Sequence, residues 1–345
     1  MNSILAACLV SFTLVAYTVG GLLHAQALDT VFDRFAQIYQ QELGSTQGCQ
    51  EPRLHEFAVC SSVLRNDGNA PYILHHGQPT EKVIVLFHGL SDSPFFLRSI
   101  ATTLHAEGYN VLVGLLPGHG LKAADADMQD PELANRWRIR VSDISQLASS
   151  LGSNKYIGGF STGGALATEY VLSHPGEYQG LMLFSGALQL DSTVETLANV
   201  WGMRWVAKMM DGDYQTEGRN PVKYPKVSTF AALQLVDVIM SVRELIQQQK
   251  PLNMPIFVAH SAADQTTLIQ GVKDLMAYNQ GQNRFFEIPQ SEGVCHADLV
   301  VSAEQLQAMH YDMTNLGETE PCSLPQVNPV HSAMLEATVS YMREF

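Results

Sequence analysis

The apolar and polar positions of this chain follow two patterns, and the pattern changes near residue 80. The first periodic stretch runs to residue 43, with apolar side chains recurring at the spacing of one helix face. We expect the segment 28–79 to form this N-terminal helix, then a loop bounded by two cysteines, then an edge hairpin that reaches Gln78.

Beyond residue 80, short continuous apolar runs alternate with helical patterns. The runs are 82–88, 109–115, 155–160, 181–185, 256–260 and 284–288. Apolar runs in which polar residues do not alternate with apolar ones are typical of strands buried on both faces, as in a parallel sheet covered by helices. The succession therefore predicts a doubly wound, mostly parallel α/β fold, with its core formed by residues 80–189 and 254–345.

The interval 190–253 interrupts this alternation, because it is much longer than one crossover helix requires. Helical patterns rich in tryptophan, methionine and aliphatic residues fill it. We interpret it as a helical cap inserted over the carboxyl edge of the sheet, where open α/β sheets bind ligands. The alternative is a set of extra helices packed on the flank of the domain.

Composition and charge narrow the class of protein. The 345 residues are 46% hydrophobic and 16% charged, which is typical of a globular chain with a large core. The formal net charge of −14 disfavours a nucleic-acid partner, whose phosphates are neutralised by Lys and Arg. It also disfavours simple electrostatic adsorption to anionic lipid.

The first 27 residues have the character of an export signal. An apolar stretch precedes the small-residue site Ala25-Gln26-Ala27, and the first charged residue is Asp29. This predicts a signal peptide, 1–27, and a periplasmic or secreted protein if the source is bacterial. No Lys or Arg precedes the apolar stretch, so an uncleaved membrane anchor, or a lipoprotein signal ending at Cys8, is an alternative.

The cysteine count agrees with export. Cleavage after Ala27 would leave four cysteines, which allow three pairings. We favour Cys49–Cys60 and Cys295–Cys322, because each closes a short loop, and each would contribute about 3 kcal/mol in the chain-entropy model. Four unpaired buried thiols are the alternative interpretation.

One motif carries a chemical hypothesis. Gly159-Phe160-Ser161-Thr162-Gly163 lies between an apolar run and a helical pattern, the context of a nucleophile elbow. A serine on such a turn stands clear at the sheet edge, and glycine neighbours let the strand and the helix approach closely. Ser161 is therefore the candidate nucleophile.

With this motif in its strand–turn–helix context, the chain resembles the α/β-hydrolases. Within them it resembles the capped carboxylesterases, monoacylglycerol lipases and lysophospholipase-like enzymes. The resemblance covers roughly residues 82–299. His88-Gly89-Leu90-Ser91 stands where the family carries its oxyanion loop, and Pro117-Gly118-His119-Gly120 resembles a glycine-rich turn of these esterases. The resemblance implies an oxyanion hole formed by the backbone N–H groups of Leu90 and Thr162.

The same resemblance implies an acid and a base in the order Ser, Asp, His. Asp264 follows the run 256–260 and His296 follows the last run, so we assign them as acid and base beside Ser161. Asp191 is an alternative acid one strand earlier, and Asp298 is a further, less suitable one.

The predicted function is a serine hydrolase that cleaves carboxylic esters through an acyl-Ser161 intermediate. The predicted substrate is a small-molecule or lipid ester, because Trp201, Trp205 and Met209 of the cap could contact an acyl chain. No cofactor or metal is implied, and membrane association would come from the N-terminal segment. The alternatives are a peptidase or an acyltransferase on the same triad, and a catalytically inactive binding protein of this fold.

Overall fold

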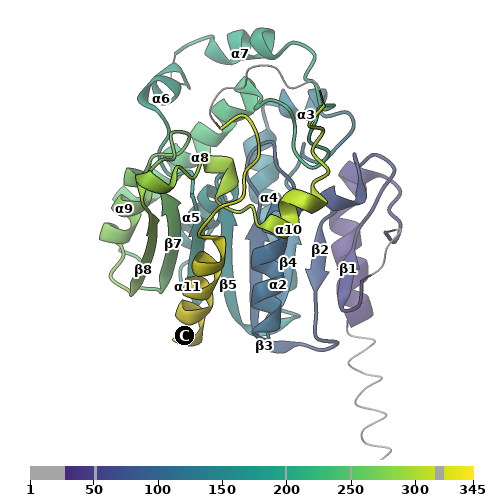
Figure 1. Ribbon diagram of the computed structural model, residues 1–345, viewed down its shortest axis with the longest axis vertical. Coiled ribbons are helices and arrows are strands. Elements are labelled where there is room, and N and C mark those ends of the chain that lie inside the picture. Colours follow the sequence, from purple (N-terminus) through teal and green to yellow (C-terminus); the bar gives the residue numbers. More distant parts are fainter. Residues whose placement is uncertain (1–27, 50–52, 199, 249–250, 315–321) are drawn as a thin grey trace, which may run out of the picture.

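The chain folds around one mixed eight-stranded sheet in its computed structural model (Figure 1). The structure describes residues 28–345 apart from 50–52, 199, 249–250 and 315–321, so the predicted signal segment and Cys8 lie outside the described residues. The strands are β1 (Glu56–Ala58), β2 (Tyr72–Leu74), β3 (Thr80–Phe87), β4 (Asn110–Gly114), β5 (Gly152–Phe160), β6 (Gly180–Phe184), β7 (Ile256–Ser261) and β8 (Asn283–Ile288).

The strand order is β1-β2-β4-β3-β5-β6-β7-β8. The first three strands of this order pair antiparallel, and the six strands from β4 to β8 are parallel. Each of the six apolar runs coincides with one of these parallel strands to within about three residues. The predicted α/β fold and the mostly parallel sheet are therefore confirmed.

Successive residues of the central strand β3 enter two different cores. Val83, Val85 and Phe87 belong to the apolar cluster on one face of the sheet. Ile84 and Leu86 belong to the cluster on the other face. A strand buried on both faces has no polar alternation, which is why its sequence is a continuous apolar run.

Helices cover both faces of the sheet (Figure 1). Besides a helix at 28–43, they are α2 (Arg98–Ala106), α3 (Asp125–Met128), α4 (Leu133–Ala148), α5 (Thr162–Ser173), α6 (Ser192–Ala198), α7 (Met203–Asp211), α8 (Thr229–Gln248), α9 (Ile269–Tyr278), α10 (Ala303–Ala308) and α11 (His331–Arg343). Within the part of the chain that the structure describes, no helix has the length and apolar character needed to cross a bilayer.

The segment 190–253 divides into two parts in space. The helix α8 packs along α5 and α4, and its apolar side chains join the core on that face. The short helices α6 and α7 instead lie above the sheet, beyond the carboxyl ends of the parallel strands (Figure 1). The second half of this segment therefore contributes to the flank, and α6 and α7 are the parts that lie over the strand ends.

Both disulfide bonds that the sequence favoured are present. Cys49 is bonded to Cys60, and Cys295 is bonded to Cys322. Disulfide bonds form and persist in oxidising compartments. Two such bonds indicate a protein of the extracellular space or the periplasm.

Candidate active site

Ser161 occupies a strained turn between β5 and α5. Its backbone has φ 53° and ψ −117°, a conformation that a residue with a side chain rarely adopts. The flanking glycines explain how the turn fits. A Cβ on Gly159 would lie 2.5 Å from the Phe87 carbonyl oxygen, and one on Gly163 would collide with the same carbonyl. The sequence motif thus provides the close packing that holds the Ser161 side chain at the strand end.

The structure brings Ser161, His296 and Asp264 into one hydrogen-bonded line. The distance from Ser161 Oγ to His296 Nε2 is 2.8 Å, and from His296 Nδ1 to Asp264 Oδ2 it is 2.6 Å. The three residues follow β5, β8 and β7, whose carboxyl ends meet at one edge of the sheet. With Asp264 ionised, Nδ1–H donates to the carboxylate, so Nε2 is free to accept the Ser161 proton.

Asp264 is buried, and the groups around it keep it ionised. Its Oδ1 accepts the backbone N–H groups of Thr266 and Thr267 at 2.8 and 3.0 Å, and the Thr267 hydroxyl donates to Oδ2 at 2.9 Å. Burial alone raises the pKa of this carboxyl. The charge and hydrogen bond of His296, the Thr267 N–H and the charge of His260 outweigh burial and lower its pKa to about 2.

The His296 ring is fixed from several sides. It stacks on Phe160 with ring centroids 4.9 Å apart, and Thr267 Oγ1 lies 3.2 Å from its Nδ1. The preceding residue, Cys295, is bonded to Cys322, so the loop that presents His296 is covalently held. These contacts restrict the imidazole to the orientation that the line of hydrogen bonds requires.

The loop after β3 is braced by His88. Its Nδ1 lies 2.8 Å from the Gly89 carbonyl oxygen, and its Nε2 accepts the Leu116 N–H at 3.0 Å. Burial lowers the pKa of His88 well below its usual range, so the ring is neutral, with Nδ1–H as donor. The ring therefore links the loop that contains Leu90 to the turn after β4.

The same loop is held on its other side by residues 222–224. Ser93 Oγ donates to the Val222 carbonyl oxygen at 2.8 Å, and the Tyr224 N–H donates to the Ser91 carbonyl oxygen at 2.8 Å. Between these contacts the Lys223 ammonium is paired with the buried Asp92 carboxylate. A segment far along the chain thus fixes the predicted oxyanion loop.

The two alternative acids lie in other environments. Asp191 is exposed, and its Oδ1 accepts the Thr193 N–H at 2.8 Å.

Asp298, the second alternative acid, is buried and accepts the Gln326 N–H at 2.9 Å. Burial raises the pKa of Asp298. The Gln326 N–H and the charges of Lys223 and His296 lower the pKa but do not offset burial, and the resulting pKa is about 6. Neither carboxylate takes the place of Asp264 beside His296.

The predicted cap contacts are on the exterior. Trp201, Trp205 and Met209 are 99%, 66% and 63% exposed. In this structure they face solvent rather than a closed acyl cavity, so their role as substrate contacts stays a prediction. Apolar character alone suggested that they would line a pocket, and it does not distinguish an inner helix face from an outer one.

Sequence reasoning missed two residues of the site. Thr267 could have been noticed, because a hydroxyl three residues after a buried aspartate at a turn can cap that carboxylate. Lys223 carried no such signal, because 131 positions separate it from Asp92. Its contribution depends entirely on how the inserted segment returns to the core.

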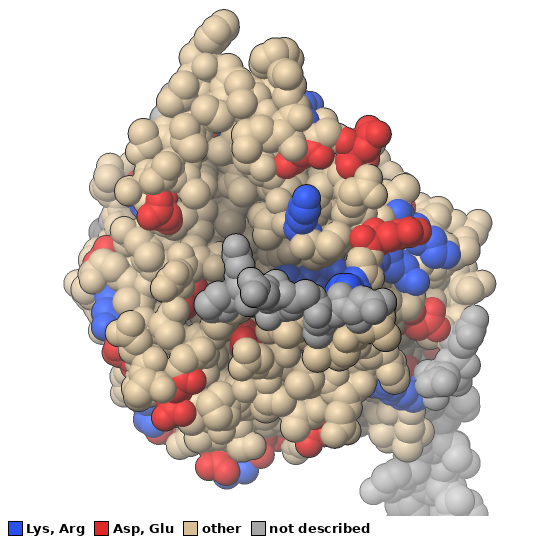
Figure 2. All heavy atoms as spheres, turned by 45° about the horizontal axis from the view of Figure 1, so that its top comes forward, with Lys and Arg blue, Asp and Glu red and all other residues tan. Residues whose placement is uncertain are grey.

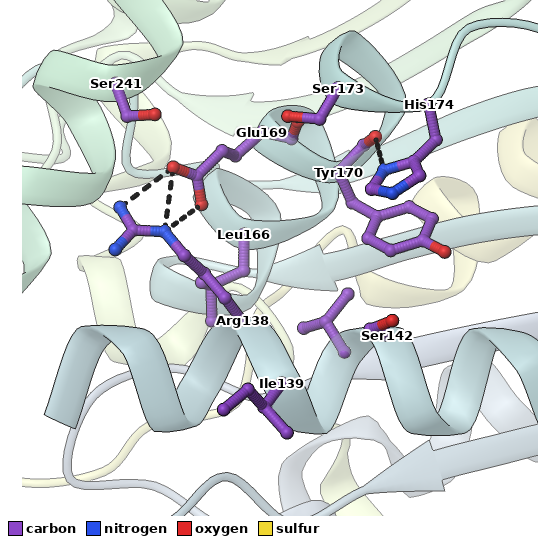
Figure 3. Close-up of a pocket in the computed structure, with 10 residues that line it drawn as sticks. Arg138, Ile139, Ser142, Leu166, Glu169, Tyr170, Ser173, His174 and Ser241 are labelled. Carbon is purple, nitrogen blue, oxygen red and sulfur yellow. Dashed lines mark hydrogen bonds and ion pairs between the residues drawn. The ribbon is translucent and has the colours of Figure 1, made fainter. Parts of the chain in front are cut away.

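A separate surface pocket lies on the flank of the domain. Arg138 of α4 and Glu169 of α5 form three hydrogen bonds of 2.8–3.0 Å at this pocket, whose volume is about 410 Å³ (Figure 3). Ser241 of α8 completes its rim, and no residue of the Ser161 site lines it. We assign no substrate to this pocket.

The described residues contain one set of side chains with spacing suited to a metal ion, Cys49, Cys60 and Asp67. The two cysteines are joined to each other, so their sulfur atoms are not available as thiolate ligands. This set therefore provides no metal site in the oxidised protein.

Comparison with known proteins gives a family and a fold. The sequence profile of the family described as "Serine aminopeptidase, S33" matches residues 78–296. Lipase 1 of Psychrobacter immobilis is 29% identical and Lipase 3 of Moraxella sp. (strain TA144) is 32% identical, each over 128 residues. Each match covers 36% of this chain and only 38% of the lipase.

The fold comparison extends further along the chain. One solved chain, described with the words "LipS and LipT, two metagenome-derived lipolytic enzymes", superimposes with a TM-score of 0.57 at 17% identity. The superposition covers 77% of this chain and 95% of that one. This likeness shows the α/β-hydrolase fold.

Proposed function

The chain belongs to the serine aminopeptidase S33 family of hydrolases, and from this premise we propose that it hydrolyses carboxylic esters through an acyl-Ser161 intermediate. One observation carries the proposal: the 2.8 and 2.6 Å hydrogen bonds that join Ser161, His296 and Asp264 in a line. A serine hydroxyl is a weak nucleophile at neutral pH, and this arrangement supplies the base that it lacks.

The proposed reaction has two acyl-transfer steps. Ser161 Oγ attacks the ester carbonyl carbon while its proton passes to His296 Nε2, and that proton then leaves with the alcohol as the C–O bond breaks. Water repeats the sequence on the acyl-Ser161 ester, which releases the carboxylic acid and restores the hydroxyl. Asp264 holds Nδ1–H and stabilises the imidazolium in both steps.

The oxyanion of each tetrahedral intermediate needs donors fixed in advance. We assign this role to the backbone N–H groups of Leu90 and Thr162. Thr162 is the first residue of α5, where N–H groups have no acceptor within the helix. The contacts of residues 91–93 with 222–224 support a fixed position for Leu90. A donor of this kind is worth about 10²- to 10³-fold in rate.

We propose lipid-like acyl esters as the substrate class. The apolar side chains of α6 and α7, above the strand ends, suit an acyl chain better than a charged substrate. The partial likeness to two bacterial lipases points the same way. In this proposal α6 and α7 act as the cap, and the enzyme works in the periplasm or outside the cell.

A chain-length series tests this function. The purified protein is assayed on p-nitrophenyl acetate, butyrate, octanoate and palmitate beside its Ser161→Ala variant. We expect Ser161-dependent release of p-nitrophenol, with a higher kcat/KM for octanoate than for acetate. A higher kcat/KM for acetate would contradict the lipid-like class, and hydrolysis that survives Ser161→Ala would contradict the mechanism.

The family description gives a reason to test peptidase activity in the same experiment. Alanine and proline p-nitroanilides serve as aminopeptidase substrates at matched concentrations. We expect kcat/KM on the esters to exceed that on the anilides by more than about 10³-fold. The reverse order would favour the peptidase alternative, and transfer of the acyl group to added glycerol in preference to water would favour an acyltransferase.

A further inference from the structure

The outer surface of the cap is strongly apolar. Six large apolar side chains between residues 200 and 210, here called the cap patch, are 38–99% exposed. They are Val200, Trp201, Trp205, Val206, Met209 and Met210. Scattered exposed apolar residues are normal, but a cluster of this kind marks an interaction surface.

Four of the six side chains of the cap patch belong to the uncovered part of an amphipathic helix, α7. On one side of α7, Met203 and Ala207 pack against Phe230 and Leu233 of α8. Trp205 and Met209 are four residues apart, so they share another side of the helix, which no part of the described chain buries. The apolar surface of α7 is therefore wider than its contact with the rest of the protein.

The charges near the cap patch differ from those of the whole chain. No acidic residue occurs between Glu195 and Asp211, although the chain has 34 acidic and 20 basic residues. The two basic residues in the interval lie at the edge of the apolar surface, where Arg204 pairs with Asp237 and the Lys208 ammonium lies 4.7 Å from the Phe230 ring centroid. Figure 2 shows few charged side chains over this end of the molecule.

Shape and residue type favour a lipid surface over a second protein copy. The helix α7, which carries four of the six side chains of the cap patch, lies at one extremity of the molecule (Figure 1). A stable dimer buries about 800 Å² per partner on a surface that fits itself. A fluid interface needs no such fit, and it accepts tryptophan at the headgroup level and aliphatic side chains below it.

We propose that the cap patch docks onto a zwitterionic phospholipid surface, with α7 lying in the interface. The apolar side chains enter the acyl boundary, and the Arg204–Asp237 pair and Lys208 lie at the level of the zwitterionic headgroups. The net charge of −14 opposes docking on an anionic surface, so neutral membranes are the better partner. Docking presents the end of the molecule that carries Ser161 to the lipid, and its test with Ser161→Ala protein does not depend on the proposed ester hydrolysis.

The tryptophans make this proposal directly measurable. The chain has three, of which Trp137 is fully buried and the other two belong to the cap patch. Full-length Ser161→Ala protein, which spares the lipid from hydrolysis, is titrated with phosphatidylcholine vesicles whose acyl chains carry bromine. We expect a blue shift and quenching of the Trp201 and Trp205 emission, and weaker quenching in phosphatidylglycerol vesicles.

Two variants separate the cap patch from the rest of the surface. The double variant Met209→Ser, Met210→Ser keeps both tryptophan reporters, and we expect its vesicle affinity to fall at least about tenfold. The control is Ile139→Ser, which removes an apolar side chain that is 52% exposed on α4. We expect this control to bind as tightly as its parent.

Three outcomes would overturn the proposal. The first is vesicle flotation without bromine quenching, which would place binding in another segment such as 1–27. The second is equal binding by the Met209→Ser, Met210→Ser variant and the Ile139→Ser control, or binding only to phosphatidylglycerol. The third is that Trp201 and Trp205 are protected from iodide quenching in the absence of lipid, to a degree that depends on protein concentration. That result would identify a second copy of the chain as the partner.

Discussion

The Lys223 ammonium is paired with the buried Asp92 carboxylate, and this ion pair joins the inserted segment to the loop that follows β3. Asp92 also shapes the loop itself. Its N–H donates to the Gly89 carbonyl oxygen at 3.2 Å, and its Oδ2 would lie 2.5 Å from a Cβ on Gly89. Leu90 lies inside this turn. The position of the Leu90 N–H therefore depends on a residue of the inserted segment.

We predict that Lys223→Met lowers kcat about tenfold on a soluble ester and changes KM little, because a displaced Leu90 N–H weakens oxyanion stabilisation. The lysine is partly exposed, so the stability loss is smaller than for a fully buried pair, about 2 kcal/mol. Lys223→Arg should restore most of kcat. A thermal melt and steady-state kinetics on all three proteins test this, and equal losses in the Arg and Met variants would refute it.

The acid assignment predicts unequal effects for two aspartates. Asp264→Asn should lower kcat by about 10³- to 10⁴-fold, because an amide favours the wrong tautomer of His296. Asp191→Asn is the matched control and should leave kcat unchanged, since that carboxylate is exposed and hydrogen-bonds only locally. Kinetics on p-nitrophenyl butyrate decide between them, and a reversal of the two effects would make Asp191 the acid.

The buried Asp298 should make stability depend on pH. Its pKa is about 6 in the folded protein and about 4 in an unfolded chain, so the folded state binds the proton more tightly. The protonated Asp298 carboxyl contributes roughly 3 kcal/mol to the free energy of unfolding. This contribution is fully present below about pH 4 and is lost as the pH rises through 6. Asp298→Asn can still accept the Gln326 N–H.

We therefore expect Asp298→Asn to melt at a higher temperature than the wild type at pH 7.5 and at a similar temperature at pH 4. Differential scanning calorimetry across this range measures the difference. If the difference in melting temperature between the two proteins is as large at pH 4 as at pH 7.5, the Asp298 carboxyl does not titrate in this pH range.

The two disulfide bonds should differ in their effect on catalysis. Replacing Cys295 and Cys322 by serine should cost about 3–4 kcal/mol of stability. It should also lower kcat about 10- to 100-fold, because the next residue, His296, would lose its anchor. Replacing Cys49 and Cys60 should cost about 3 kcal/mol and leave kcat near wild type. Equal kcat values for the two double variants would remove the link to His296.

The sequence was sufficient for the elements whose signals are local. The β3 residues had to form a buried strand because no polar residue interrupts their run from Val83 to Phe87. Ser161 was identifiable because glycines flank it at a strand end. Asp264 and His296 followed from the positions at which the family carries its acid and base, and the structure places His296 against Ser161 and Asp264 against His296.

The rest depends on contacts between distant segments. Nothing near Lys223 indicates that it reaches Asp92, because that pairing is set by the path of the inserted segment. The direction in which Trp205 faces was also hidden, because an apolar helix can bury either side. Its exposure depends on which side of α7 packs on α8, and in the structure that side carries Met203 and Ala207.

A fluorophosphonate probe tests the central claim most directly, because it phosphonylates a serine that a neighbouring base has activated far faster than an ordinary serine. The folded wild-type protein should be labelled at Ser161, as located by mass spectrometry, and Ser161→Ala should not be labelled. His296→Ala should keep its fold and lose nearly all labelling. Absence of labelling in folded wild-type protein, or equal labelling of Ser161→Ala, would contradict the assignment of Ser161 as a nucleophile.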